Sequence, residues 1–209
     1  MKAMLLAAGR GERMGALTAQ QPKPLIEVGG QSLISRHLGR LHDAGVDDVV
    51  INLSYLGDQI REALGDVSDW GQRLRYSEEG EPALETAGGI IAALPLLGAD
   101  PFVVVSADVY TDFDFATLDT VDAEGVLMLV PNPSHHELGD FGLSDDGIVS
   151  LKPPRLTFGG VAKMARSLFD GLSPGRRALR PVLEAAIHRA ALKGVRYDGI
   201  WSDVGTPER

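Results

Sequence analysis

A short apolar run that leads into a loop with two glycines constrains the fold of this chain more than any other feature. Residues 2–8 are long enough for one buried strand, and Gly9 and Gly11 follow at its end. Three isolated cations come next in the sequence: Arg10, Arg13 and Lys23. Because glycine has no Cβ, the loop can turn tightly and place backbone N–H groups against phosphate oxygens, which arginine and lysine also bind. This order predicts a polyphosphate site directly after the first strand.

Two common phosphate-binding loops do not fit the spacing of these residues. The dinucleotide pattern G-x-G-x-x-G, counted from Gly9, requires a glycine where Met14 stands. The Walker A pattern requires Gly-Lys-Ser/Thr at the end of the loop, whereas Lys23 lies well after Gly11 and between two prolines. The loop is therefore predicted to hold phosphate in a different way from either of them.

The first half of the chain alternates between strand and helix patterns. Three short runs rich in β-branched or aromatic residues predict strands at residues 48–53, 73–77 and 102–106. Helical spacing of apolar residues predicts helices at residues 33–44, 56–64 and 88–94. Ser32 can cap the first helix and Gly45 can end it. This order predicts a Rossmann-like α/β fold, a three-layer sandwich around a mixed, mostly parallel sheet, with ligands at the carboxyl ends of the strands.

The second half of the chain has a more mixed pattern. The predicted elements are a strand at 125–130, a hairpin around the turn 145–147, a helix at 179–193, and short strands at 195–198 and 201–204. An α/β chain of 209 residues can bury one sizeable core. We therefore expect residues 1–209 to form a single domain.

Composition excludes several classes of site and partner. The sequence has no cysteine, which excludes disulfides, thiolate metal sites and a cysteine nucleophile, and which fits a cytoplasmic protein. A net charge of -9 without a basic stripe argues against nucleic acid as a partner. The most apolar later stretch, residues 88–105, is interrupted by two prolines and an aspartate, so no membrane span is expected. The densest cations, Arg176, Arg177 and Arg180, are expected on a solvated helix surface.

The aspartate just beyond the predicted strand 102–106 is the first candidate for a metal ligand. Asp108 is expected at the carboxyl edge of the sheet, where the glycine loop also emerges. Magnesium prefers one or two carboxylates, completed by substrate phosphates and water. Asp112 and Asp114 are expected to be loop or cap residues, with Asp112 a less favoured candidate for the site. His135 and His136 would point opposite ways in an extended chain, so a loop role is favoured over a metal pair.

The segments around the glycine loop resemble a known signature. Residues 6–14 read Leu-Ala-Ala-Gly-x-Gly-x-Arg-Met, and Leu17-Thr18 and Pro22-Lys-Pro-Leu25 follow, as in the sugar-phosphate nucleotidyltransferase family. The resemblance implies a GT-A-like α/β domain with Arg13 and Lys23 as catalytic residues. It also implies nucleotide contacts from the loop itself: Ala7, Ala8, Gly9 and Gly11. In one departure, Gly15-Ala16 stands where the family usually has Arg-Pro.

Later segments extend this resemblance. Residues 84–89, Leu-Glu-Thr-Ala-Gly-Gly, are similar to the base-recognition segment of the family. This similarity implies three further nucleotide contacts: Glu79, Thr86 and Gly88. Asp108, and Asp203 in Trp-Ser-Asp-Val-Gly, match the two metal-binding aspartates of the family and imply a Mg²⁺ cofactor. Four positions match sugar-facing positions: Asn132, Asp140, Gly142 and Gly160. The resemblance thus implies a nucleotide-binding half, about residues 1–115, and a sugar-binding half, about residues 116–209.

The resemblance implies transfer of a nucleoside monophosphate from a nucleoside triphosphate to a sugar 1-phosphate, with release of pyrophosphate. Segments 84–86, 108–112 and 132–141 are most similar to a short, single-domain branch of the family. That similarity implies UTP and N-acetylmuramate 1-phosphate as substrates, in peptidoglycan recycling. Family members usually continue past Glu208-Arg209 into another helix, so a longer natural chain is expected.

Two other functions stay open at this point. The shared motifs also fit a mannose-1-phosphate guanylyltransferase. A regulator that binds a nucleotide sugar without turnover is compatible with Gly15-Ala16 and with Leu151, which stands where the family has glutamate. Lys23, Asp108 and Asp203 are all present and favour an enzyme. The sequence does not indicate an oligomeric state.

Overall fold

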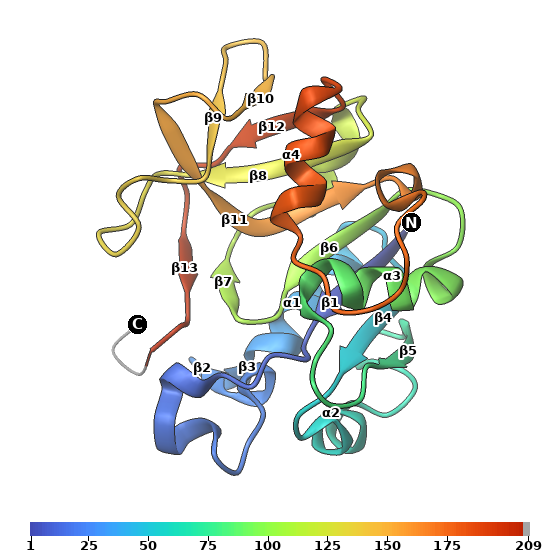
Figure 1. Ribbon diagram of the computed structural model, residues 1–209. Coiled ribbons are helices and arrows are strands. Elements are labelled where there is room, and N and C mark those ends of the chain that lie inside the picture. Colours follow the sequence, from blue (N-terminus) through green and yellow to red (C-terminus); the bar gives the residue numbers. More distant parts are fainter. Residues whose placement is uncertain (207–209) are drawn as a thin grey trace.

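The computed structural model describes residues 1–206, with the backbone alone at Glu12, Arg13 and Ala16. A mixed nine-stranded sheet runs through the molecule, and helices cover both of its faces (Figure 1). Its parallel part has the order β6-β1-β4-β5 and consists of β1 (Lys2–Leu6), β4 (Asp48–Leu53), β5 (Arg73–Glu78) and β6 (Phe102–Ser106). These strands confirm the predicted ones, except that β1 ends at Leu6 and Ala7-Ala8 already belongs to the loop.

Helices pack on opposite faces of this parallel part. The helices are α1 (Leu33–Asp43), α2 (Gly57–Leu64), α3 (Glu85–Leu97) and α4 (Arg180–His188). Apolar side chains of α1 and α2 share one core with Ala3 and Leu5 of β1, whereas those of α3 and α4 share the other core with Met4. Successive strand residues point to opposite faces, so β1 supplies both cores. The predicted three-layer sandwich is confirmed.

The predicted ends of α1 are confirmed, whereas α3 is longer than its prediction at both ends. Ser32 caps α1 and accepts a hydrogen bond from the backbone N–H of Ser35 at 3.2 Å, and Gly45 follows the helix with φ +76°. The predicted helix 88–94 extends at both ends to the bounds of α3 and takes in Pro95 near its C-terminal end. The predicted helix stopped before Pro95, whereas α3 continues through this proline to Leu97.

The second half adds antiparallel strands to the sheet. These are β8 (Gly125–Val130), β9 (Phe141–Leu143), β10 (Val149–Ser150) and β11 (Arg155–Met164), and β12 (Leu192–Arg196) pairs in parallel with β8. The ten-residue β11 was not predicted, although it pairs with both β6 and β8 and so joins the two halves of the chain. Its pairing with β8 shifts register between Phe158 and Ala162, around two glycines that hide the strand pattern.

One predicted helix is too long. The predicted helix 179–193 ends at His188, because Ala190 has φ +54° and turns the chain, and residues 192–196 then form β12. The apolar residues of β12 continue the helical pattern by chance. The predicted strand 195–198 therefore starts three residues earlier than expected and ends at Arg196.

Two small ribbons and four short 3₁₀ helices complete the fold. The ribbons are β2 (Glu27–Val28) with β3 (Gln31–Ser32), and β7 (Val109–Thr111) with β13 (Trp201–Asp203). The 3₁₀ helices are η1 (Glu12–Thr18), η2 (Lys23–Leu25), η3 (Phe115–Thr120) and η4 (Arg166–Phe169). Within residues 1–206, no helix combines the length and the apolar character that crossing a bilayer requires. The β7–β13 ribbon stands at the carboxyl end of β6 and positions much of the site described next (Figure 1).

Candidate active site

A close ion pair joins the predicted catalytic lysine to the first predicted metal ligand. Lys23 Nζ lies 2.6 Å from Asp108 Oδ2, although the two residues are far apart in the sequence. The Lys23 side chain is 7% exposed and that of Asp108 is 41% exposed, so the pair opens to solvent on the aspartate side. Pro22 and Pro24 flank Lys23 in η2 and restrict its backbone. The lysine is thus held in place, with its charge directed at the carboxyl edge of the sheet.

The glycine loop and this ion pair line a cavity of about 630 Å³. Several of the predicted residues share its walls: Ala7, Ala8, Gly9, Gly11, Lys23, Thr86 and Asp108. Gly11 has φ +65°, and a Cβ there would approach Thr18 Cγ2 to 3.0 Å, so a side chain does not fit. Arg10 also lines the cavity and pairs with Glu81 at 2.9 Å. The side chain of Arg13, the other predicted catalytic residue, lies outside the described part of the structure.

A buried amide that the sequence did not single out fixes the start of the glycine loop. Asn52, at the end of β4, accepts the backbone N–H of Ala7 at 2.7 Å and donates to Glu79 Oε1 at 2.6 Å. The other oxygen of Glu79 accepts the backbone N–H of Leu84 at 2.7 Å. Glu79 thus ties the loop to the segment that leads into α3, and it lies behind the cavity, outside its lining residues. A polar residue at the end of an otherwise apolar strand was the available signal for Asn52.

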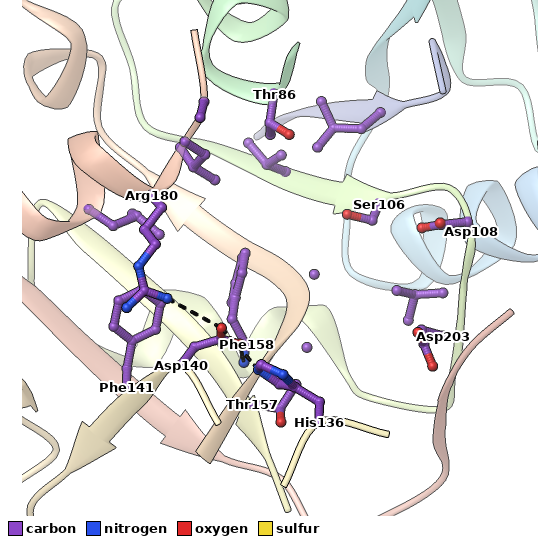
Figure 2. Close-up of a pocket in the computed structure, with 18 of the residues that line it drawn as sticks. Thr86, Ser106, Asp108, His136, Asp140, Phe141, Thr157, Phe158, Arg180 and Asp203 are labelled. Carbon is purple, nitrogen blue, oxygen red and sulfur yellow. Dashed lines mark hydrogen bonds and ion pairs between the residues drawn. The ribbon is translucent and has the colours of Figure 1, made fainter. Parts of the chain in front are cut away.

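A second cavity, of about 770 Å³, adjoins the first, and Figure 2 shows residues that line it. The two cavities have four lining residues in common: Leu6, Thr86, Ser106 and Asp108. Predicted sugar-side residues Asp140 and Gly160 line the second cavity, together with Asp203. The two cavities therefore join at the end of β6.

The β7–β13 ribbon places the two predicted metal ligands on one wall. Asp203 of β13 stands opposite Val109 in this antiparallel pair, and the backbone N–H of Val204 donates to the carbonyl of Asp108 at 2.9 Å. Both carboxylates reach the same end of the larger cavity (Figure 2). Residues 108 and 203 are thus brought together by strand pairing alone.

This pair of carboxylates suits a hard divalent cation that also binds a substrate. Among the described residues, no group of three or more His, Asp or Glu side chains gathers closely enough to hold an ion without help. Magnesium commonly takes only one or two carboxylates and completes its octahedron with phosphate oxygens and water. Asp108 and Asp203 are two carboxylates on one wall of the larger cavity, and Asp108 also lines the cavity of the glycine loop, so the residues present fit such an ion.

The loop 131–140 brings two histidines to the larger cavity. His135 Nε2 lies 3.2 Å from Asp203 Oδ1, and His136 Nε2 lies 3.1 Å from Asp140 Oδ1. The two imidazoles contact different carboxylates, so they do not form a metal pair with each other. The predicted loop role is correct, and the structure adds that both rings line the cavity.

Four of the predicted contact residues do not line either cavity: Glu79, Gly88, Asn132 and Gly142. Asn132 accepts a hydrogen bond from Thr157 and donates to the carbonyls of Glu137 and Arg155, so it holds the loop to β11. A Cβ on Gly142 would lie 2.2 Å from the carbonyl of Lys152. At Gly88, the nearest atom to such a Cβ would be the carbonyl oxygen of Gly175, at 2.4 Å. Gly88 and Gly142 thus lie where the backbone packs too closely for a side chain, next to the site.

Arg180 lines the larger cavity, which corrects the prediction of a purely solvated surface. Its Nη1 lies 3.5 Å from Asp140 Oδ1, its Nε donates to Glu184 at 2.8 Å, and its guanidinium lies 5.4 Å from the ring centre of Phe141. Arg176 and Arg177 do not line either cavity. Helical periodicity gave no reason to separate Arg180 from its neighbours.

His37 supports from behind the wall that contains Asp108. Its Nε2 lies 2.7 Å from the carbonyl of Val109, next to Asp108, and its ring packs against Phe115. The pKa of His37 is lowered from 6.5 to about 4, chiefly by burial and to a smaller extent by the nearby charges of Arg40 and Arg36. A neutral His37 therefore donates from Nε2 to the carbonyl at neutral pH.

The other predicted carboxylates near the site serve the fold. Asp112 accepts hydrogen bonds from the Tyr197 hydroxyl and from the backbone N–H of Ile200, and the Tyr197 contact is the main reason its pKa is lowered. Burial and the same contact raise the pKa of Tyr197 to about 12. Asp114 caps η3 through the N–H of Ala116. Both residues are loop or cap residues, as predicted.

Known proteins resemble this chain along its length. Residues 2–143 match the nucleotidyl transferase family. An N-acetylmuramate alpha-1-phosphate uridylyltransferase of Neisseria meningitidis serogroup B is 48% identical over 99% of this chain and 94% of its own length. A mannose-1-phosphate guanyltransferase of Schizosaccharomyces pombe is 30% identical over 100% of this chain, which spans 62% of that protein. A solved Bacillus anthracis protein described as a glucose-1-phosphate thymidylyltransferase has the same fold, with a TM-score of 0.87 and 20% identity over 100% of this chain and 91% of that one.

Proposed function

The chain belongs to the nucleotidyl transferase family, and from that membership we propose that it transfers the uridylyl group of UTP to N-acetylmuramate 1-phosphate. The products are UDP-N-acetylmuramate and pyrophosphate. One observation carries the proposal beyond family membership: the phosphate cavity and the larger cavity meet at Asp108. Two anionic substrates can therefore bring their phosphates together over one carboxylate wall. We propose peptidoglycan recycling in the cytoplasm as the setting of this reaction, because N-acetylmuramate is a peptidoglycan sugar.

The two cavities divide the substrates between them. UTP occupies the cavity of the glycine loop, where backbone N–H groups and Lys23 face its phosphates. The sugar occupies the larger cavity, whose wall includes Phe141, Thr157 and Phe158. Apolar faces with a few polar groups suit a pyranose ring that carries hydroxyl and amide groups. The sugar phosphate then lies at Thr86, Ser106 and Asp108, where the cavities join.

The reaction itself is an in-line displacement at the α-phosphorus of UTP. An oxygen of the sugar phosphate forms the new P–O bond, and the bond to the β-phosphate oxygen breaks as pyrophosphate leaves. The second pKa of a phosphate monoester is about 6, so the attacking oxygen is already anionic at neutral pH and needs no general base. Catalysis therefore rests on placing two like-charged groups in line and compensating their charge.

Lys23 supplies a positive charge for this compensation. The Lys23 ammonium is buried on its own side and directed at the junction of the cavities, so water screens it less than it would an exposed lysine. Arg13 follows the loop in the sequence and would add a bidentate donor to the departing phosphates. Magnesium held by Asp108 and Asp203 would neutralise phosphate charge and align the oxygens. Asn52 keeps the loop in position through the N–H of Ala7.

A pyrophosphate-release assay that crosses UTP, GTP, CTP and ATP with several sugar 1-phosphates tests the proposal. We expect turnover with UTP and N-acetylmuramate 1-phosphate, loss of turnover with a chelator, and recovery when Mg²⁺ is restored. The product is verified by its mass. Turnover with GTP and mannose 1-phosphate alone would favour the guanylyltransferase alternative. An absence of product with every pair would instead support a non-catalytic regulator.

A further inference from the structure

The larger cavity has one feature that a neutral sugar would not use. Its end opposite Asp108 and Asp203 is formed by Arg180 and Phe141 (Figure 2). We infer that Arg180 selects the substrate by binding the carboxylate of its sugar. The inference rests on the proposed function, because N-acetylmuramate differs from N-acetylglucosamine by a lactyl ether that ends in a carboxylate. The contact would determine specificity and take no part in bond breaking.

Arg180 is the one permanently charged cation among the described residues that line this cavity. The same walls contain the carboxylates of Glu85, Asp108, Asp140 and Asp203. Such a surface repels an anionic sugar unless a fixed positive charge receives its acidic group. Lys23 lies in the other cavity, where it faces the phosphates. A sugar acid with two anionic groups therefore needs a second cation, and Arg180 is the residue in position to supply it.

The guanidinium is held in place before any ligand arrives. Glu184 accepts from its Nε at 2.8 Å, one turn further along α4. Asp140 Oδ1 lies 3.5 Å from its Nη1, and Asp140 is itself fixed because its Oδ2 accepts the backbone N–H of Phe158 at 2.8 Å. The ring of Phe141 lies under the guanidinium at 5.4 Å. A pre-oriented guanidinium loses little side-chain freedom when it binds a carboxylate.

These contacts leave donors for a ligand. An arginine has five N–H donors, and among the described residues only Glu184 takes a hydrogen bond from Arg180. The outer edge of the guanidinium can therefore accept a carboxylate in a bidentate arrangement. The lactyl group is attached at C3 of the sugar and the phosphate at C1, so the two anionic groups leave the ring at different positions. A sugar phosphate at the Asp108 end directs its lactyl group away from that end.

A helix arginine that faces solvent would show the same local pairing with Glu184, so the arginine directly after α4 serves as the comparison. Arg189 follows the last residue of α4, pairs with Glu124 at 3.5 Å and lines a different cavity. Its side chain is 53% exposed, against 48% for Arg180. The two residues thus match in charge and exposure and differ in the cavity that they reach.

The test compares Arg180→Gln with Arg189→Gln on two substrates of nearly equal shape. These are N-acetylmuramate 1-phosphate and its carboxamide, each with saturating UTP. We expect Arg180→Gln to lower the ratio of kcat/KM values, acid over amide, by about 10- to 100-fold, the range for a hydrogen bond to a charged group. The change should appear mainly in KM for the acid. Arg180→Lys should retain part of the preference, and Arg189→Gln should retain the wild-type ratio.

The possible outcomes distinguish an error in the role of Arg180 from an error in the proposed function. If the wild-type enzyme uses N-acetylmuramate 1-phosphate but Arg180→Gln loses the same factor on acid and amide, the assignment of Arg180 is wrong and the proposed function stands. In that case the ratio of kcat/KM values, acid over amide, stays at its wild-type value. A wild-type enzyme that uses neither substrate, with any nucleotide, overturns both the proposed function and this inference. Thermal unfolding of Arg180→Gln and Arg180→Lys establishes that the variants are folded.

Discussion

His37 gives the protein an acid sensitivity whose size follows from its burial. The ring is 1% exposed, and its Nε2 is engaged with the carbonyl of Val109. Its Nδ1 is buried and has no hydrogen-bond partner among the described residues. A second proton would have to reside on Nδ1 as an unpaired, desolvated charge, which is why burial lowers the pKa to about 4.

The consequence is a loss of stability as the pH falls. Above pH 6.5 His37 is neutral in both the folded and the unfolded chain, and its contribution is fully present. Between pH 6.5 and about 4 the unfolded chain binds a proton that the folded chain does not, so the free energy of unfolding decreases. The full shift corresponds to about 3 kcal/mol, of which about 2 kcal/mol is lost by pH 5.

Urea denaturation of the wild type and His37→Gln, between pH 8 and pH 5, measures this contribution. Glutamine keeps an N–H for the carbonyl of Val109 and does not titrate, so the variant should lose about 2 kcal/mol less than the wild type over that range. Carboxylates elsewhere titrate in both proteins and cancel in the difference. His42→Gln, an exposed histidine of the same helix, is the control and should follow the wild type.

Parallel stability curves for the wild type and His37→Gln would refute the reasoning. A direct measurement in the wild type does not depend on how well the variant folds. The NMR signal of the His37 ring should show no titration above about pH 5. A midpoint near 6.5 would mean that the ring is accessible to water, and the hydrogen bond to Val109 would then not support the segment next to Asp108.

Two further predictions concern the phosphate site. Lys23→Ala and Asp108→Asn should each reduce kcat by roughly two to three orders of magnitude in the pyrophosphate-release assay, because each removes a fixed charge at the junction of the cavities. Turnover close to the wild-type rate in either variant would contradict the assignment. Asn52→Ala should lower the free energy of unfolding by about 1–3 kcal/mol, because the N–H of Ala7 and an oxygen of Glu79 lose their partner. An unchanged urea midpoint would show that water replaces the amide.

The strands and the first loop were predictable because their signals are local. An apolar run of five or six residues between turn residues has few alternatives, and β4, β6 and β8 begin and end where the sequence indicated. Where two signals overlapped, the local pattern failed. Residues 189–193 were predicted to continue the helix, but Leu192 and Lys193 pair with β8 in the sheet and belong to β12.

The site residues also differ in whether a local sequence signal identifies them. The glycine loop, Lys23 and Asp108 were found because residue type and order in the chain identify them. Glu79 and Asn132 were predicted as ligand contacts, and the structure gives both side chains hydrogen-bond partners in the protein, outside the cavities. Asn52 was missed, because one polar residue in an apolar strand does not show which neighbouring segment will use it.

The sequence by itself determined a parallel α/β core with a glycine loop at its edge, since both depend on residues that are close together in the chain. Only the tertiary structure decided what surrounds the sugar cavity. Asp203 reaches Asp108 through the pairing of β13 with β7, and Arg180 faces the cavity although a solvent-facing arginine would show the same helical pattern. The physical reason is that such contacts join segments distant in the chain, and local periodicity records which face a side chain occupies but not what that face will meet.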